Sequence, residues 1–192
     1  MTVNQNCLFK ESSDEGSRGY HPGPIGILDQ RRSVIFMKFY HFDRTQILHL
    51  PLAQAFAFFA DPRHLEAITP GFVHFKFLRD PPPILQAGSV VDYRIRMFGV
   101  PVRWQARIEV WEPPHRFVDA QVRGAFASWH HTHLFEDAGD GRTRMREQIE
   151  FAMPMGVLGR IAYRLFVART LERIFDLRAE RLSALMPRAS DK

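Results

Sequence analysis

The sequence predicts an α+β domain in which a seven-stranded antiparallel sheet wraps around one long C-terminal helix, with two short helices after the first strand. Three observations predict this class. Seven segments of alternating apolar and polar residues are separated by short turn signals, as in an antiparallel meander. A stretch rich in alanine and phenylalanine follows the first of them. Residues 160–186 lack Gly and Pro and repeat apolar side chains every three or four positions.

The first strand is predicted over Phe39–Leu50, and Pro51 then opens a short helix. Asp61-Pro62 ends that helix and begins a second one, which stops at Thr69-Pro70-Gly71. Prolines and glycines separate the six strands that follow. These strands are predicted at Val73–Leu78, Ser89–Phe98, Val102–Trp111, Arg116–Val122, Phe126–Glu136 and Thr143–Met153.

The C-terminal helix is predicted over residues 160–186, with Pro187 at its end. A helix with one apolar face is expected to lie across the concave face of the curved sheet, because both apolar surfaces are then buried. The residues predicted to form that face are Leu158, Ile161, Leu165, Ala168, Leu171, Phe175, Leu182 and Leu185.

The length of 192 residues suits one domain with a tail. Residues 1–36 lack a sustained apolar pattern and are predicted to be a flexible leader, followed by the domain at 37–187 and a tail at 188–192. The leader has no apolar core of a secretory signal. The single cysteine, Cys7, excludes an internal disulfide framework, so a cytoplasmic location is expected.

The net charge of +5 does not by itself indicate a polyanion partner. The 22 arginines and 4 lysines are scattered among acidic residues, so no nucleic acid is expected. The C-terminal helix is more basic, with six arginines and three acids. That charge is typical of a solvated face, but it also makes the helix a candidate for peripheral contact with an anionic lipid or a partner. The oligomeric state is not indicated.

Strand alternation predicts which side chains face the interior. Tyr93, Trp104 and Trp129 belong to the inward set, whereas most residues of the opposite set are arginines. The same alternation turns five polar side chains inward, where each needs a hydrogen-bond partner or water. These residues are Asp119, Gln121, His131, His133 and Glu147.

A hairpin turn centred on Gly139 would pair His131 with Glu147, His133 with Met145 and Phe135 with Thr143. A histidine beside an inward carboxylate can orient a ligand carbonyl or hydroxyl, or act as acid and base near neutral pH.

Three interpretations of the inward polar group remain open: a recognition patch in a ligand pocket, a satisfied structural network, and a catalytic or metal site. His131-Thr132-His133 with Glu147 or Asp119 has the ligand types of a two-histidine, one-carboxylate metal site. Two histidines flanking one residue on a strand are a weak signal, and neither a metal nor a cofactor is expected. The sequence contains no phosphate-binding glycine loop, nucleophile elbow or HExxH motif.

Several local motifs carry a family resemblance: Asp61-Pro62, Ile68-Thr69-Pro70-Gly71, Pro113–Asp119, Trp129–Phe135 and Gly141-Arg142-Thr143. On these residues, from about Lys38 to Leu185, the chain resembles the START-like or SRPBCC superfamily of helix-grip proteins. Within it, the chain resembles the bacterial polyketide cyclase/dehydrase and coenzyme-Q-binding START-type proteins. The resemblance implies a cavity between sheet and long helix that holds a hydrophobic small molecule.

The expected function is binding or carriage of a lipid, isoprenoid, quinone or polyketide-like molecule. Its expected contacts are Tyr93, Trp104, Asp119, Trp129, His131, His133 and Glu147. One alternative is a cyclase or dehydratase-type enzyme in which His131 is a general base oriented by Glu147. A second alternative is a non-enzymatic adaptor or ribosome-associating module that uses the basic helix. A carrier needs an open cavity, whereas an adaptor does not.

Overall fold

The computed structural model describes residues 37–186. The predictions for the leader, for Cys7, for Pro187 and for the tail lie outside the described residues. The first part of the described chain contains β1 (Phe39–Leu48), α1 (Leu52–Ala60), α2 (His64–Ile68), the 3₁₀ turn η1 (Gly71–Val73) and β2 (Lys76–Phe77). Five strands follow: β3 (Val90–Met97), β4 (Val100–Glu112), β5 (Arg116–Arg123), β6 (Ser128–Gly139) and β7 (Arg142–Ala152). The chain continues through α3 (Gly156–Ala162), the π-helical segment η2 (Tyr163–Val167) and α4 (Ala168–Leu185).

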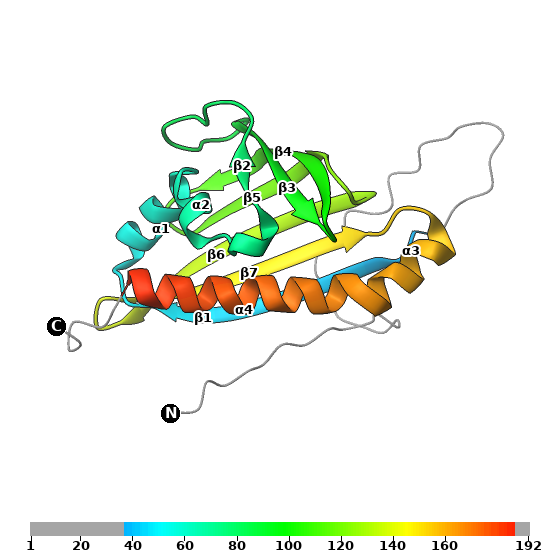
Figure 1. Ribbon diagram of the computed structural model, residues 1–192. Helices are drawn as coiled ribbons and strands as arrows, with labels where there is room; N and C mark the ends of the chain where they lie inside the picture. Colours follow the sequence, from blue (N-terminus) through cyan, green and yellow to red (C-terminus); the bar gives the residue numbers. More distant parts are fainter. Residues whose placement is uncertain (1–36, 187–192) are drawn as a thin grey trace.

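The seven strands form one antiparallel sheet in the order β1-β7-β6-β5-β4-β3-β2. Strands that follow one another in the chain from β2 to β7 are adjacent in the sheet, and β1 pairs with β7. Figure 1 shows the long helix crossing in front of this curved sheet, with α1 and α2 near the C-terminal end of α4 and α3 at the other end. The predicted helix-grip architecture is therefore confirmed.

Two apolar clusters fill the space between sheet and helices. The first contains Phe56 and Phe59 of α1 with Phe135 and Leu182, so the short helix closes one end of the sheet. The second contains Phe42, Trp104, Trp129 and Phe151 from the sheet with Phe175 of α4. The aromatic side chains of one strand come from positions two residues apart, which share one face of that strand.

The strand predicted at Val73–Leu78 is mostly wrong. Residues 71–73 form a 3₁₀ turn, and His74 then adopts a left-handed conformation with φ of 48°. Only Lys76 and Phe77 pair with β3, at the edge of the sheet. The turn that begins at Pro70-Gly71 therefore includes Val73, the residue at which the alternating pattern predicted the start of a strand.

The predicted register of the last hairpin is also wrong. Asp140 and Gly141 both have positive φ, which is typical of a two-residue hairpin turn, and Gly139 pairs with Arg142 beside an irregularity. His133 is therefore opposite Glu147, and His131 is opposite Ile149. The register differs from the prediction by two residues, so every side chain keeps its predicted face.

The predicted apolar face of the C-terminal helix is wrong at its beginning and its end. Leu158, Ile161, Leu165 and Leu185 are half exposed or more. The predicted residues Leu171, Phe175 and Leu182 are buried, and the other buried residues of the helical segment include Tyr163, Val167 and Arg178. The π-helical turn at 163–167 changes the angle between successive residues. The apolar spacing of α4, continued toward the N-terminus through this turn, therefore predicts the wrong buried positions. No helix among residues 37–186 is long and apolar enough to cross a membrane.

Candidate functional site

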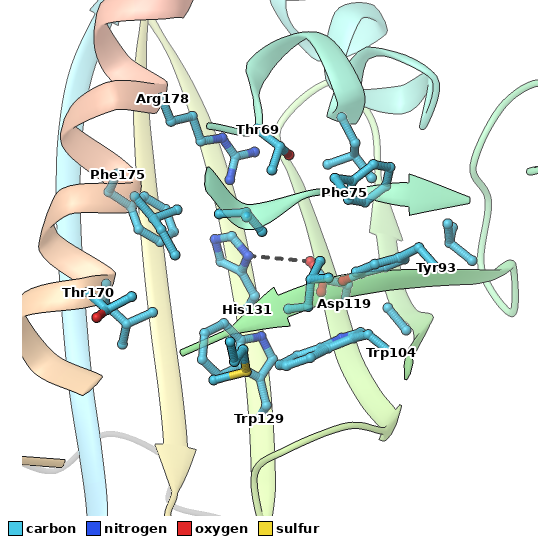
Figure 2. Close-up of a pocket in the computed structure, with 18 of the residues that line it drawn as sticks. Thr69, Phe75, Tyr93, Trp104, Asp119, Trp129, His131, Thr170, Phe175 and Arg178 are labelled. Carbon is cyan, nitrogen blue, oxygen red and sulfur yellow. Dashed lines mark ion pairs between the residues drawn. The ribbon is translucent and has the colours of Figure 1, made fainter. Parts of the chain in front are cut away.

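A cavity of about 420 Å³ lies between the sheet and the C-terminal helix. Most of its wall is apolar and aromatic, contributed by both core clusters. Figure 2 shows Trp104, Trp129 and Tyr93 on the sheet side of the cavity and Phe175 and Thr170 on the helix side. Its volume is in the range of small-molecule sites, which are usually concave and largely apolar.

Three polar side chains of the sheet reach the cavity from neighbouring strands. Asp119 of β5 is directly opposite His131 of β6, and His133 is two residues farther along the same strand. His131 and His133 therefore share the concave face, and their rings are 3.9 Å apart between centroids. Figure 2 shows the interaction of His131 with Asp119 as a dashed line.

Asp119 lies between the two imidazoles on the cavity side. Its Oδ2 is 3.0 Å from His133 Nε2, which donates a hydrogen bond, and 3.6 Å from His131 Nδ1. The Asp119 side chain retains 19% exposure, whereas the side chains of His131 and His133 retain only 8% and 5%. A ligand in the cavity therefore meets Asp119 more readily than the ring nitrogens.

Glu147 of β7 lies behind the histidines and does not line the cavity. Its Oε1 is 3.4 Å from His131 Nε2, 3.6 Å from His133 Nδ1 and 3.1 Å from Arg178 Nη1. Each histidine thus has one ring nitrogen toward Asp119 and the other toward Glu147. We refer to Asp119, His131, His133, Glu147 and Arg178 as the polar cluster.

Arg178 was not among the predicted site residues. It projects from α4 into the cavity (Figure 2). Its guanidinium lies over the rings of Phe59 and Phe175. The sequence contained a signal for it, because Arg178 is three residues after Phe175 and four before Leu182, on the helix face that packs on the sheet. A cation on an apolar face indicates a buried anion opposite.

The charges of the polar cluster follow from burial and pairing. Burial opposes ionisation of Glu147, but Arg178 and then His131 and His133 lower its pKa to about 2. Burial likewise opposes ionisation of Asp119, yet His133, His131 and Arg178 keep its pKa below the usual value. Burial, followed by the proximity of His131, lowers the pKa of His133 to about 4. Near neutral pH the cluster thus holds two carboxylates, one guanidinium and a neutral His133.

The aromatic wall contains one buried donor. Trp104 Nε1 has no hydrogen-bond partner among residues 37–186, and the Trp104 side chain lines the cavity. Its ring meets Trp129 edge-on at 5.3 Å between centroids and is stacked with Tyr93 at 6.4 Å. Burial and then the charge of Asp119 raise the pKa of Tyr93, so its hydroxyl is protonated at neutral pH.

The structure brings six of the seven predicted ligand contacts to the cavity wall, and the seventh, Glu147, to the layer behind it. Gln121 has a structural role instead, because its side chain exchanges hydrogen bonds with the backbone of Phe126 across the β5–β6 connection. His130 points to the outer face, where it is near Glu109.

Comparison with protein families identifies the chain's relatives. Residues 40–187 match the model of the family described as polyketide cyclase / dehydrase and lipid transport. No curated protein sequence matches the chain significantly.

Solved structures share the fold at low sequence identity. A protein of Thermus thermophilus superimposes with a TM-score of 0.59 at 16% identity, over 76% of this chain and 98% of that chain. The Zhui aromatase/cyclase of a Streptomyces species gives 0.58 at 15%, over 79% and 98%. A norcoclaurine synthase point mutant of Thalictrum flavum gives 0.56 at 13%, over 76% and 95%. These similarities establish the fold and leave the chemistry to the site.

Proposed function

The chain belongs to the polyketide cyclase / dehydrase and lipid transport family of the SRPBCC helix-grip superfamily, and we propose that it binds or carries a small hydrophobic molecule in the cavity between sheet and α4. A lipid, isoprenoid, quinone or polyketide-like compound has the required chemistry. The observation that carries the proposal is the cavity itself, which combines an aromatic wall with one polar edge at Asp119. Ligand sites commonly have this composition.

The polar edge favours a ligand that has both a donor and an acceptor. Ionised Asp119 accepts a hydrogen bond, so a ligand hydroxyl can donate to it. Trp104 Nε1 is a donor without a partner among the described residues, so a ligand carbonyl or ether oxygen would satisfy it. A hydroxylated aromatic or polyketide-like carbonyl compound offers both groups.

A second candidate is a cyclase or dehydratase-type enzyme, supported by one observation. His131 lines the cavity, and Glu147 approaches its Nε2 at 3.4 Å from behind, which is the arrangement of a carboxylate that orients a base. However, the other ring nitrogen of His131 faces Asp119 rather than open cavity. The arrangement therefore supports binding better than proton abstraction by His131. An adaptor is the least supported function, because it requires no cavity.

Binding can be tested with a neutral naphthalene-based fluorescent probe. Because Trp129 lines the cavity, Trp129→Ala should weaken probe binding at least about tenfold while the far-ultraviolet spectrum stays unchanged. Trp111→Ala is the matched control, because Trp111 is partly buried but does not line the cavity. Absence of probe binding in the parent protein, or equal loss in both variants, would contradict the proposal. Native mass spectrometry of the purified protein would identify a copurified ligand.

Glu147→Gln distinguishes the two candidates once a ligand is known. In a carrier it changes ligand affinity by no more than roughly 0.5–1.5 kcal/mol, the value of one hydrogen bond, because Glu147 lies behind the histidines and does not line the cavity. In an enzyme that uses the His131–Glu147 pair, turnover falls about 10²-fold or more. Recovery of unaltered ligand from the parent protein supports the carrier, and conversion that is lost in both Glu147→Gln and His131→Ala establishes the enzyme.

A further inference from the structure

We propose that Asp119, His131 and His133 bind a divalent transition-metal ion at the polar edge of the cavity. This inference is independent of the proposed function and reverses the expectation drawn from the sequence. The three donor atoms Asp119 Oδ2, His131 Nδ1 and His133 Nε2 lie within 4.8 Å of one another. Their type, two imidazole nitrogens and one carboxylate oxygen, suits zinc and related ions.

The spacing of these atoms fits a common metal. Ligands at about 2.0–2.1 Å from a tetrahedral zinc ion are about 3.3–3.4 Å apart. Asp119 Oδ2 is 3.0 Å from His133 Nε2 and 3.6 Å from His131 Nδ1, and all three donor atoms lie within 4.8 Å of one another, so the two imidazoles must turn toward each other to complete the geometry. All three residues line the cavity, which leaves a further coordination position for water or a ligand oxygen.

The strongest support comes from the atoms behind the ligands. His131 Nε2 and His133 Nδ1 are buried and have no hydrogen-bond partner among residues 37–186. Glu147 Oε1, which Arg178 contacts at 3.1 Å, is only 3.4 Å and 3.6 Å from these two nitrogens. In the hydrogen bond to Asp119, His133 carries its proton on Nε2, so its Nδ1 presents a lone pair to an anion. A metal on His131 Nδ1 and His133 Nε2 places the protons on the opposite nitrogens. Both then point a proton at Glu147, and the two unpartnered nitrogens are satisfied.

The charge balance agrees with a cation at this site. The polar cluster contains two carboxyl groups and one guanidinium, and the guanidinium is paired with Glu147. Arg178 contacts Glu147 at 3.1 Å and leaves Asp119 as the anion facing the cavity. A divalent ion adds positive charge next to that carboxylate.

The metal alone is the probe in the test. The full chain, without a histidine tag and treated with a chelator, is titrated with Co²⁺ while visible absorption is recorded, and Zn²⁺ is then added in competition. We expect one ion per chain, a higher thermal midpoint with Zn²⁺, and at least about tenfold weaker binding in Asp119→Asn and His133→Gln. Glu147→Gln should weaken binding about 10–100-fold, because it replaces the carboxylate behind both ligands with a neutral amide.

His130→Gln is the matched control, because His130 lies on the same strand but is exposed on the outer face, and its binding should equal the parent's. Circular dichroism shows whether each variant is folded, and Asp119→Asn and His133→Gln provide independent tests of the same site. Absence of metal binding in the parent protein overturns the proposal. So does binding that persists unchanged in both folded variants, because the ion then lies elsewhere.

A different region of the molecule carries a second inference. We propose that the exposed apolar side chains of α3, η2 and the β3–β4 turn form a docking surface for an anionic lipid bilayer. Phe98 and Phe166 are 57% and 54% exposed, yet their rings contact each other at 5.8 Å between centroids, so the turn and the helix form one patch. The remaining members of the docking surface are Val100, Met155, Val157, Leu158, Ile161 and Leu165.

Charge decides which occupant suits this surface. Residues 151–171 contain Arg160, Arg164 and Arg169 and no acidic residue, and residues 93–108 contain four arginines, of which Arg103 is paired with Asp92. Apolar side chains flanked by arginines match the acyl boundary and the anionic headgroups of a bilayer. Phe98 also lines the cavity and is exposed, so the docking surface reaches the cavity wall. A hydrophobic ligand could then pass between membrane and cavity.

Cosedimentation with vesicles tests the docking surface. The full chain should bind vesicles of equal parts phosphatidylglycerol and phosphatidylcholine and bind pure phosphatidylcholine far more weakly. Phe98→Ser combined with Leu165→Ser, and separately Arg160→Glu, should each reduce binding about tenfold or more. Ile84→Ser and Arg144→Glu are the controls, because both residues are exposed outside the docking surface. No binding to anionic vesicles, or equal loss in the controls, overturns the proposal and leaves a protein partner as the occupant.

Discussion

The two halves of the C-terminal helical segment differ in what they bury, although both are rich in apolar residues. In α4, Leu171, Phe175 and Leu182 pack on the sheet, and Arg178 joins the polar cluster. In α3 and η2, only residues 159, 163 and 167 are buried, and the larger aliphatic residues face outward. An apolar helix face therefore belongs to the hydrophobic core only where it packs against a second surface. Beyond the end of β7 the sheet no longer provides that surface.

The largest expected difference between the halves concerns arginine. Arg178→Met should lower the free energy of unfolding by about 3–5 kcal/mol, because it leaves buried Glu147 without its cation. Arg160→Met in the exposed half should change it by less than about 0.5 kcal/mol. Urea denaturation of the chelator-treated protein measures both values. Similar small changes in the two variants would mean that the polar cluster does not depend on α4.

Leucine substitutions should separate the halves in the same way. Leu182→Ala removes a side chain that is fully buried and should cost about 2–5 kcal/mol, whereas Leu165→Ala, at 56% exposure, should cost less than about 0.5 kcal/mol. Thermal and urea unfolding monitored by circular dichroism check the contrast. A large loss in Leu165→Ala would place that residue in a core and would also weaken the docking-surface proposal.

The polar cluster should make the stability of the folded protein decrease at acidic pH. The pKa of His133 in the folded protein is about 4, below its ordinary value, so the unfolded chain binds the proton first as the pH falls. The stability of the metal-free protein should decrease on the order of 2 kcal/mol between about pH 7 and pH 5. The low pKa of Glu147 adds a further loss between about pH 4.5 and pH 2. His133→Gln should flatten the upper part of this pH profile, and an unchanged slope would show that other groups dominate it.

A further effect is expected in α3, where Gly159 packs closely against the β7–α3 connection. A Cβ on Gly159 would lie 2.0 Å from the carbonyl oxygen of Pro154, so Gly159→Ala must displace the helix. We expect a cost of about 1–3 kcal/mol and faster amide exchange confined to α3. Gly159→Ala with parent-like exchange would indicate that α3 is already loosely held.

Much of the site could be predicted because strand alternation is local and tolerant of error. The inward direction of Asp119, His131, His133 and Glu147 depends only on odd or even spacing, so a register error of two residues left every face unchanged. The pairing itself could not be predicted, because the hairpin turn lies at Asp140-Gly141 and the strand next to it is irregular. Arg178 was missed because arginines are mostly exposed in proteins, whereas this one lies on the buried face of α4.

The sequence by itself determined the order of strands and helices, the curved sheet around one long helix, and which strand faces are apolar, because these follow from short periodic patterns and from the prolines and glycines between them. Only the tertiary structure decided how far the helix packs and which polar atoms meet. The π-helical turn at 163–167 changes the buried face of the helix, and the convergence of two histidines, two carboxylates and Arg178 requires β5, β6, β7 and α4 to assemble. Contacts between segments far apart in the chain depend on distances that no local pattern encodes.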